Sequence, residues 1–324
     1  VGQHVHTQDL PINNVTITLS PLTVAFSAFD KRWLYMEELG TCEAVDTMPE
    51  DWLISPDGKQ AAFTRQFNLW VRDLISGEER ALTQDGEKNF VYGALGTAWG
   101  FVADGDGGLQ ARWSPDSRRL FSVQRDTRQV KDLPLIHHVP QDSSIRPQVT
   151  TRKEAYPGDA HIETLRLLAI DIKTKQIQEA NYRPIPVTRS VRPFFDSNLG
   201  WWSIDNRRAY FVDVERGYKT ARVVEFNTCT GATRILFEEH TNTHISLMHN
   251  SDESPVLRPL PDTNELLWYS ERSGWAHLYL YDLKTGKLKN PVTQGDWLVR
   301  DVVKVDTKRR EVFVQTAGRN QDWD

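Results

Sequence analysis

The stretch Asn264–Lys287, NELLWYSERSGWAHLYLYDLKTGK, carries the clearest evidence for the fold of this chain. Two apolar and aromatic runs, Leu266–Tyr269 and His277–Tyr281, flank a charged turn, a pattern that predicts two strands joined in a hairpin. A second turn follows, because Gly286 can take the positive φ that tight hairpins need. A third strand is expected to begin near Leu288.

Both faces of this hairpin are expected to be covered. Side chains alternate along a strand, so Leu278 and Leu280 share one face while Tyr279 and Tyr281 share the other. A sheet with two covered faces packs between neighbours on both sides. We therefore expect the hairpin to be one of several stacked sheets.

The same order of turns and strands recurs along the chain. The copies are SPDGKQAAFTR with NLWVRDLISGEERALT (Ser55–Thr83), WSPDSRRLFSVQR with LLAIDIKTKQIQEA (Trp113–Ala180), WSIDNRRAYFVD with ARVVEFNTCTGATRILF (Trp202–Phe237), and VDTKRREVFVQT (Val305–Thr316). The turn that opens each copy contains one aspartate: Asp57, Asp116, Asp205, Asp262 or Asp306. Because these aspartates are unevenly spaced, we expect the extra length to lie in loops.

Repeats of roughly 40 to 50 residues built from four short strands are typical of β-propeller blades. The sequence therefore predicts an all-β propeller, with residues 1–324 as a single domain. Irregular insertions are expected near 86–110 and 126–163, which are rich in glycine and proline, respectively. A β-sandwich with coincidental turns is the alternative.

Composition narrows the class of protein. With 324 residues, 39% hydrophobic and 26% charged, the chain is an ordinary globular one. The net charge of -5 comes from interspersed acidic and basic residues, so we expect no nucleic-acid partner. No apolar run approaches the ~18 residues of a membrane span. The start, Val1–His4, is neither an initiator methionine nor a signal peptide, which indicates a chain trimmed at its front.

The sequence gives no evidence for a metal or another cofactor, and we expect none. Cys42 and Cys229 are far apart and form no CxxC pair, so two unpaired thiols are expected, of undetermined redox state. His240, His244 and His249 have a spacing that suggests ligands on a helix. The residues between the first two are poor helix formers, however, so a metal site is not predicted.

Six segments together resemble the N-terminal propeller of bacterial dipeptidyl peptidase IV proteins. They are Phe63–Arg65, Leu82–Gly86, Arg112–Ser117, Gln124–Thr127, Leu133–Leu135 and Ser270–Tyr279. The resemblance extends from about Asp51 to Val314 and depends on the ordered set, since each Ser-Pro-Asp-Gly turn alone occurs in many propellers.

This resemblance implies a serine exopeptidase of the prolyl oligopeptidase class, in which an eight-bladed propeller caps an α/β-hydrolase domain. The chain has no Gly-x-Ser-x-Gly elbow and no alternation of strands and helices, so we expect this chain alone to be non-catalytic. Because the last copy, Val305–Thr316, supplies two strands, we expect an incomplete propeller with about five to six of the eight blades.

The same resemblance implies the partners. They are a peptide substrate and an α/β-hydrolase domain of the same parent chain, and an unpaired strand edge favours a homodimer. The family also implies a periplasmic or secreted location.

In this family a pair of adjacent glutamates binds the free α-amino group of the substrate. The resemblance places that pair between Tyr92–Gly93 and Trp113, but Thr97–Asp106 contains no glutamate. Asp104 and Asp106 are the candidate carboxylates there, although aspartate reaches less far. Two aspartates in a solvated turn are the alternative interpretation.

The family also uses an arginine of an early blade to bind a substrate carbonyl, and Arg32 occupies the corresponding place. Glu37 and Glu38 are adjacent but fall in a different blade from the family's pair, so we expect them to be surface charges. Glu271 and Arg272 are expected to pair within their own turn.

The sequence therefore predicts the non-catalytic propeller part of a dipeptidyl peptidase IV-like serine peptidase, which caps the active site and selects peptides. The alternative is a catalytically silent propeller that serves as a protein-interaction scaffold. A downstream Gly-x-Ser-x-Gly followed by Asp and His would distinguish the two.

Overall fold

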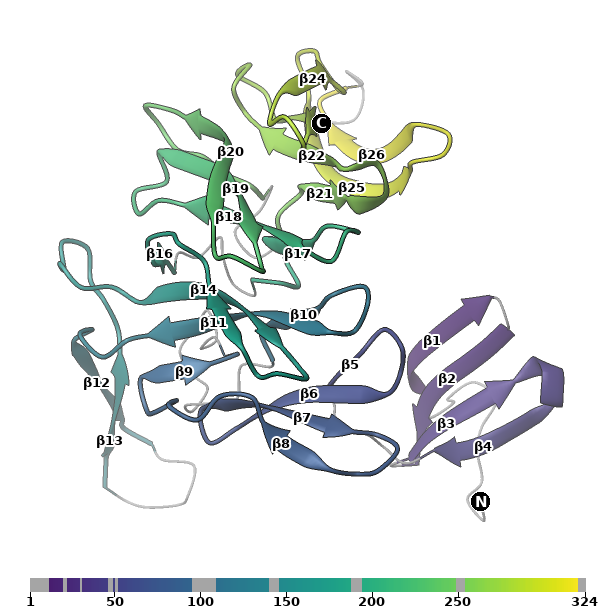
Figure 1. The fold of residues 1–324 in the computed structure, drawn as a ribbon. Helices are drawn as coiled ribbons and strands as arrows, with labels where there is room; N and C mark the ends of the chain where they lie inside the picture. Colours follow the sequence, from purple (N-terminus) through teal and green to yellow (C-terminus); the bar gives the residue numbers. More distant parts are fainter. Residues whose placement is uncertain are drawn as a thin grey trace. The chain divides into compact units, whose positions relative to one another are not determined.

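The computed structural model describes residues 12–19, 22–29, 31–45, 49, 52–94, 109–139, 146–187, 194–248 and 254–319. The chain forms two compact units, residues 1–52 and residues 53–324. No α-helix occurs in the described residues, whose regular structure is antiparallel β-sheet with two short 3-10 turns (Figure 1). The predicted all-β class is therefore confirmed.

The first unit contains one four-stranded antiparallel sheet in which each strand pairs with the next along the chain. Its elements are β1 (Asn13–Leu19), β2 (Leu22–Ala28), β3 (Lys31–Met36), η1 (Glu37–Leu39) and β4 (Thr41–Val45). Gly40 ends η1 at a φ of 60°, which glycine adopts without the strain that a Cβ would add.

The second unit repeats this four-stranded arrangement four times and ends in a two-stranded sheet. The four sheets are β5 (Leu53–Ile54), β6 (Gln60–Arg65), β7 (Asn68–Asp73) and β8 (Glu79–Ala81); β10 (Ala111–Trp113), β11 (Arg119–Asp126), β14 (Thr164–Asp171) and β15 (Ile177–Glu179); β17 (Gly200–Trp202), β18 (Arg208–Val214), β19 (Thr220–Asn227) and β20 (Thr233–His240); and β21 (Arg258–Leu260), β22 (Glu265–Ser270), β23 (His277–Asp282) and β24 (Leu288–Pro291). The two-stranded sheet is β25 (Leu298–Asp306) with β26 (Glu311–Ala317), and η3 (Pro261–Thr263) joins β21 to β22.

Each sheet has two structurally different ends. Because neighbouring strands are antiparallel, the turn after the first strand and the turn after the third strand lie at the same end. All five predicted repeat aspartates lie in or beside first turns at this end, which we name the turn end. The opposite end, which we name the link end, contains the turns after the second strands and the segments that connect one sheet to the next.

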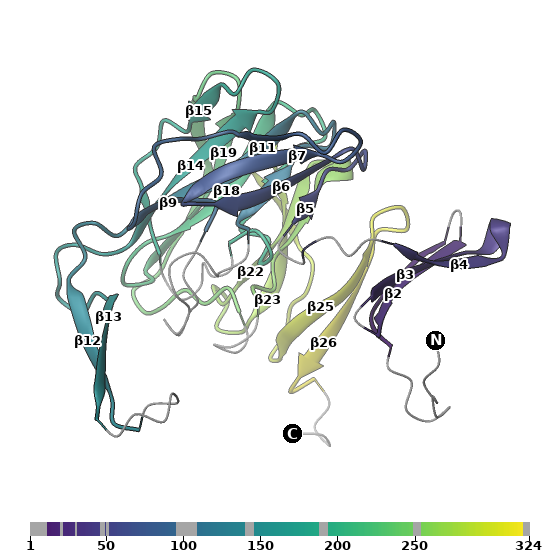
Figure 2. The ribbon, with the colours of Figure 1, turned by 90° about the horizontal axis from the view of Figure 1, so that it is seen from below.

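The two predicted insertions occur at different places in the second sheet. The first interrupts its first strand, so that β9 (Phe90–Tyr92) and β10 pair with different halves of β11. The second lies between β11 and β14 and contains its own hairpin, β12 (Asp132–His137) and β13 (Gln148–Lys153), which projects from the sheet (Figure 2). A short strand, β16 (Ile185–Pro186), also pairs with β14. The second insertion is thus more regular than predicted.

Tryptophans at the ends of first strands connect successive sheets. The indole Nε1 of Trp113 donates a hydrogen bond to the carbonyl oxygen of Leu53, at 2.8 Å. In the next sheet Trp202 Nε1 donates to the carbonyl oxygen of Arg112, at 2.9 Å. The same contact therefore recurs from one sheet to the next.

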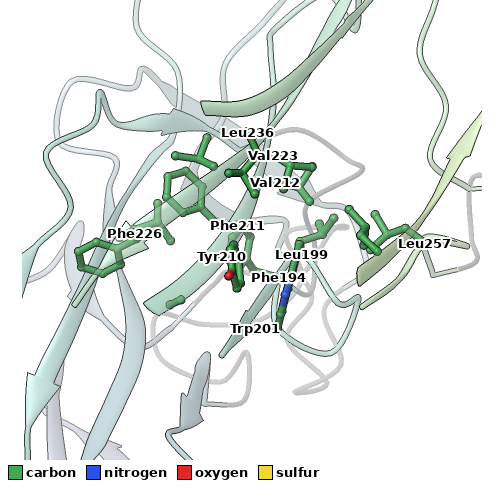
Figure 3. Packing of buried hydrophobic residues seen from close by; sticks show 14 of the residues in the cluster. Phe194, Leu199, Trp201, Tyr210, Phe211, Val212, Val223, Phe226, Leu236 and Leu257 are labelled. Atoms are coloured by element: carbon green, nitrogen blue, oxygen red, sulfur yellow. The ribbon is translucent and has the colours of Figure 1, made fainter. Parts of the chain in front are cut away.

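The largest hydrophobic cluster lies between the β17–β20 sheet and its neighbours on both sides. Phe211 and Phe226 are fully buried there, beside Tyr210, which stacks on Trp201 with ring centroids 5.5 Å apart (Figure 3). Apolar side chains therefore fill the space between successive sheets, as a stack of blades requires.

The predicted division of the β23 faces is confirmed. Tyr279 and Tyr281 belong to the large cluster shared with the preceding sheet. Leu278 and Leu280 instead pack with residues of the following sheet, including Val305 of β25.

Candidate functional site

The segment 95–108, which contains the predicted amine-binding residues, leaves and re-enters the β-sheet at a single point. Ala94 and Leu109 form an isolated antiparallel bridge on either side of it. Next to this bridge, the backbone N–H of Gln110 donates to the carbonyl oxygen of Gly93, at 2.7 Å. The two ends of the segment are therefore held side by side within the first strand of the second sheet.

This base is tightly packed. Gly93 has a φ of 64°, and a Cβ there would lie 2.6 Å from a methyl group of Leu69. The side chain of Gln110 is buried, and its Oε1 accepts hydrogen bonds from the backbone N–H groups of Phe194, at 2.9 Å, and Phe195, at 3.4 Å. A buried polar group with satisfied hydrogen bonds fixes the position of the chain around it.

The three predicted site residues are not brought together in the described part of the chain. Asp104 and Asp106 lie outside the described residues. Arg32 lies in β3 of the first unit, where its backbone pairs with Ser27 and Val45, and its side chain is also outside the described part. All three assignments stay predictions.

The sequence contains three adjacent glutamate pairs, Glu37–Glu38, Glu78–Glu79 and Glu238–Glu239. The first pair is exposed in η1, in agreement with the prediction of surface charges. In the second pair, the Glu79 carboxylate lies 2.8 Å from Arg65 and 3.0 Å from Arg72 within its own sheet. Glu79 is therefore occupied by cations of its own sheet.

In the third pair, Glu239 forms a hydrogen-bonded cluster that sequence reasoning missed. Its Oε2 accepts from Trp268 Nε1, at 2.6 Å, and from Arg272 Nη2, at 2.5 Å. Its Oε1 accepts from the Ser270 hydroxyl, at 2.5 Å. The prediction that Arg272 pairs with Glu271 is wrong, because the carboxylate within reach belongs to the preceding sheet. The cluster connects β20 to β22 at the link end.

A second missed cluster surrounds Asp213, near the link end of β18. The carboxylate is fully buried, and its Oδ2 accepts from Tyr182 Oη, at 2.9 Å, and from Arg183 Nη2, at 2.6 Å. Arg222 Nη1 is 3.5 Å from the same oxygen, while Oδ1 has no hydrogen-bond partner among the residues that the structure describes. Burial raises the pKa of Asp213 above its ordinary value, although Arg183 opposes this effect. Burial, together with the charge of Asp213, raises the pKa of Tyr182 to about 12.

The histidines that were considered as metal ligands have other contacts. His240 Nδ1 is 3.3 Å from the Thr220 hydroxyl, and the His244 ring packs on Tyr218 with centroids 4.7 Å apart. His249 lies outside the described residues. In the described part of the chain no three His, Cys, Asp or Glu side chains are grouped as a metal site would need.

The sequence lacks the nucleophile elbow of a serine hydrolase. Among the described residues, no helix has the length and the apolar character that crossing a membrane requires.

Comparison with known sequences identifies the chain's relatives. Residues 22–320 match the family described as dipeptidyl peptidase IV (DPP IV) N-terminal region. Proteins named "Probable dipeptidyl peptidase 4" from Aspergillus flavus and Emericella nidulans are 23% identical over 292 residues and 24% identical over 293 residues. Each alignment covers 86% of this chain and 36% of the relative, so the chain spans about a third of the relatives' length.

Comparison with solved structures confirms the predicted propeller fold. The crystal structure of Porphyromonas gingivalis dipeptidyl peptidase 4 matches with a TM-score of 0.68 at 17% identity, covering 95% of this chain and 41% of that one. At this identity the likeness shows the fold alone. Among the described residues, five sheets have four or more strands, fewer than the eight blades that the resemblance implies for a complete propeller, as predicted.

Proposed function

Because this chain belongs to the dipeptidyl peptidase IV (DPP IV) N-terminal region family, we propose that it is the non-catalytic propeller of a DPP IV-like serine peptidase. In this role it caps the active site and selects the peptide substrate. The observation that carries the proposal is the family match over residues 22–320. The rigid base of segment 95–108 supports it, since that segment is where the resemblance places the amine-binding residues.

Selection of the substrate depends on the charge of its amino terminus. A free α-amino group has a pKa near 8 and is positive at neutral pH. Asp104 and Asp106 supply the carboxylates nearest in sequence to the family's missing glutamate pair, and Arg32 supplies a donor for a substrate carbonyl. Since the shorter aspartates reach less far, the preference for a free amine is weaker than two well-placed glutamates would give.

The proposed partners follow from the relatives. The relatives named dipeptidyl peptidase 4 are almost three times as long as the part aligned here, and we assign the α/β-hydrolase domain to the rest of the parent chain. We further propose that residues 1–324 form one propeller domain. In the described residues β26 pairs with β25 alone, and an unpaired strand edge of this kind favours a homodimer.

The test uses the full-length parent protein. We expect it to cleave an Xaa-Pro anilide and its N-acetyl derivative with kcat/KM values that differ by about tenfold or less, because one weak charge-assisted contact contributes about 1.5 kcal/mol. Asp104→Asn and Asp106→Asn should reduce that difference further. Asp262→Asn, an exposed aspartate at the turn end, is the matched control.

Two results would contradict this assignment. The first is a thousandfold preference for the free amine that neither aspartate substitution changes, since the amine would then bind elsewhere. The second is turnover by the 324-residue chain alone that a serine-directed inhibitor blocks. If the full-length parent itself is inactive, the alternative of an interaction scaffold replaces the proposal.

A further inference from the structure

Two turns at the link end share a sequence pattern but differ in their surroundings. The β18–β19 turn reads Glu-Arg-Gly-Tyr over residues 215–218, and the β22–β23 turn reads Glu-Arg-Ser-Gly-Trp over residues 271–275. Both glycines have left-handed backbone conformations, with φ of 96° at Gly217 and 92° at Gly274. The aromatic residue therefore follows a left-handed glycine in each turn, although Tyr218 is itself left-handed, with a φ of 57°.

In the β18–β19 turn, both the acid and the aromatic residue are occupied by contacts within the protein. The Glu215 carboxylate accepts a hydrogen bond from Arg222 Nη1, at 2.6 Å, and lies 3.6 Å from Arg183. The Tyr218 ring packs on His244 of the segment that leads to the next sheet. This turn therefore has no free group with which to bind a ligand.

The β22–β23 turn leaves the corresponding groups open. Trp275 is 40% exposed, and no ring of the described residues packs on its indole. Glu271 is exposed and forms no ion pair with a described residue, because the adjacent Arg272 pairs with Glu239. An uncovered indole and an unpaired carboxylate thus occur within five consecutive residues.

The backbone that carries these two groups is held rigidly. The N–H of Gly274 donates to the carbonyl oxygen of Glu271, at 2.9 Å, and the Ser273 hydroxyl donates to the carbonyl oxygen of Trp275, at 3.1 Å. Between them, Arg272 Nε donates to the Ser270 hydroxyl, at 2.9 Å. A preorganised turn loses little conformational entropy when it binds a ligand.

On the other side of the turn, the strand that follows is equally well fixed. His277 is buried, and its ring nitrogens lie 3.0 Å from the Thr293 hydroxyl and 2.9 Å from the carbonyl oxygen of Gly295. The Arg272 guanidinium also lies 4.4 Å from the ring centre of Tyr279. The exposed side chains of the turn therefore extend from a fixed support.

An exposed indole face and a carboxylate are the combination that attracts an organic cation, through the ring quadrupole and through charge. We propose that the Glu271–Trp275 turn binds a primary ammonium group of a peptide. This inference rests on the proposed role in peptide selection and adds a second contact for the substrate, separate from segment 95–108. The apolar area is that of one indole, which suits a single side chain or terminus, whereas a protein partner needs about 800 Å² on each side.

The test is a binding experiment on the 324-residue chain labelled with 5-fluorotryptophan. The chain has 11 tryptophans, and Trp275→Phe identifies the fluorine signal of Trp275. The probes are Ala-Pro-Ala-Ala amide with a free amino terminus, its N-acetyl derivative, and N-acetyl-Ala-Pro-Lys-Ala amide. A shift with the first probe alone identifies the α-amino group as the ligand, and a shift with the third identifies the lysine side chain.

The variants test both groups separately. Because the Trp275 variants lack the fluorine reporter, the Kd of every variant is measured by isothermal titration calorimetry. We expect Glu271→Gln and Trp275→Ala each to raise the Kd by about three- to fivefold, and Trp275→Phe to raise it less, because phenylalanine keeps an aromatic face. Ile204→Ala is the matched control, since Ile204 is an exposed apolar residue at the turn end. Thermal unfolding of each variant should match the wild type, because both side chains are exposed.

The inference is overturned if the N-acetyl, lysine-free probe shifts the Trp275 signal equally, or if Glu271→Gln leaves the Kd unchanged. It is also overturned if none of the probes shifts that signal. None of these results bears on the kcat/KM assay of the full-length parent, so failure here and failure of the proposed function are distinguishable.

Discussion

The turn end and the link end of the sheets differ in how closely their turns approach the neighbouring sheet. At the turn end, a Cβ on Gly286 would lie 2.1 Å from the carbonyl oxygen of Leu236 in the preceding sheet, and a Cβ on Gly231 would lie 2.8 Å from that of Glu179. At the link end, Gly217 and Gly274 have no atom within 4 Å of such a Cβ. These two turn-end glycines are therefore enclosed by the neighbouring sheet, whereas these two link-end turns are open, as is the first turn at Gly58.

Two buried carboxylates, Glu265 at the turn end and Asp213 near the link end, differ in their hydrogen bonds and in the direction of their pKa shifts. At the turn end, Glu265 Oε1 accepts from Lys289, at 2.5 Å, and Oε2 accepts from Arg310, at 2.5 Å. Burial opposes ionisation of Glu265, but the hydrogen bonds from Arg310 and Lys289 outweigh it and lower the pKa to about 2. Near the link end, all donors to Asp213 converge on one oxygen, and its pKa is raised instead.

The difference indicates a division of roles along each sheet. The Trp113 and Trp202 hydrogen bonds connect successive sheets at the turn end, as the Glu239 cluster connects two sheets at the link end. The link end carries the β12–β13 hairpin, the oxygen of Asp213 that has no partner among the described residues, and the exposed indole of Trp275. Binding residues are commonly found on such irregular segments, supported by a rigid scaffold.

The largest expected effect is the loss of stability when one methyl group is added to a glycine at each end. Gly286→Ala should lower the free energy of unfolding by about 4 kcal/mol, since it adds overlap with a backbone carbonyl to the strain of a left-handed alanine. Gly274→Ala should cost only about 1 kcal/mol, since its Cβ meets open space. Urea unfolding of both variants measures this difference, and equal losses would show that the turn end is not the more tightly packed one.

A smaller loss of stability is expected when Glu265 and Asp213 are replaced by the uncharged amides of the same shape. Glu265→Gln should lower the free energy of unfolding by about 2 kcal/mol, because its two cations are half exposed and their attraction is partly screened. Asp213→Asn should cost less than about 1 kcal/mol, because burial already disfavours its charge. Glu311→Gln, an exposed residue of β26, is the control. A larger loss for Asp213→Asn than for Glu265→Gln would contradict the comparison.

The repeat could be predicted from the sequence because its signals are local. Asp57, Asp116 and Asp205 lie in turns that are specified by four or five consecutive residues, and strand alternation in β23 follows from a period of two. The β-hairpins therefore occur where the turn residues and the apolar runs predict the same structure. The same reasoning predicted stacked sheets with an incomplete set of blades.

The contacts between sheets could not be predicted in the same way. Arg272 was expected to pair with its sequence neighbour Glu271, but its partner Glu239 lies 33 residues away. Arg310 reaches Glu265 across 45 residues. Such ion pairs depend on how successive sheets are placed in space, and the pattern of neighbouring residues does not indicate that placement. A rule that pairs sequence neighbours therefore selects the wrong partner. Asp104 and Asp106 stay predictions because they lie outside the described residues.

The smallest expected effect is a pH dependence of opposite sign at the two ends. A carboxyl group whose folded pKa is lowered stabilises the fold above its unfolded value, and that contribution is lost as the pH falls. For Glu265 the loss should extend from about pH 4.5 to about pH 2. Asp213 has a raised pKa, so its contribution is present below pH 3.8 and is lost as the pH rises through the folded value.

These signs can be read from two difference curves. Subtracting the free energy of unfolding of each variant from that of the wild type, by urea unfolding at pH 3, 4, 5 and 7, isolates one group at a time. The wild-type advantage over Glu265→Gln should grow as the pH rises from 3 to 5 and then become constant. The difference from Asp213→Asn should instead fall as the pH rises above 3.8. If both curves rise together, the unpartnered oxygen of Asp213 is stabilised by a donor such as a bound water, and the two ends satisfy their buried carboxylates equally.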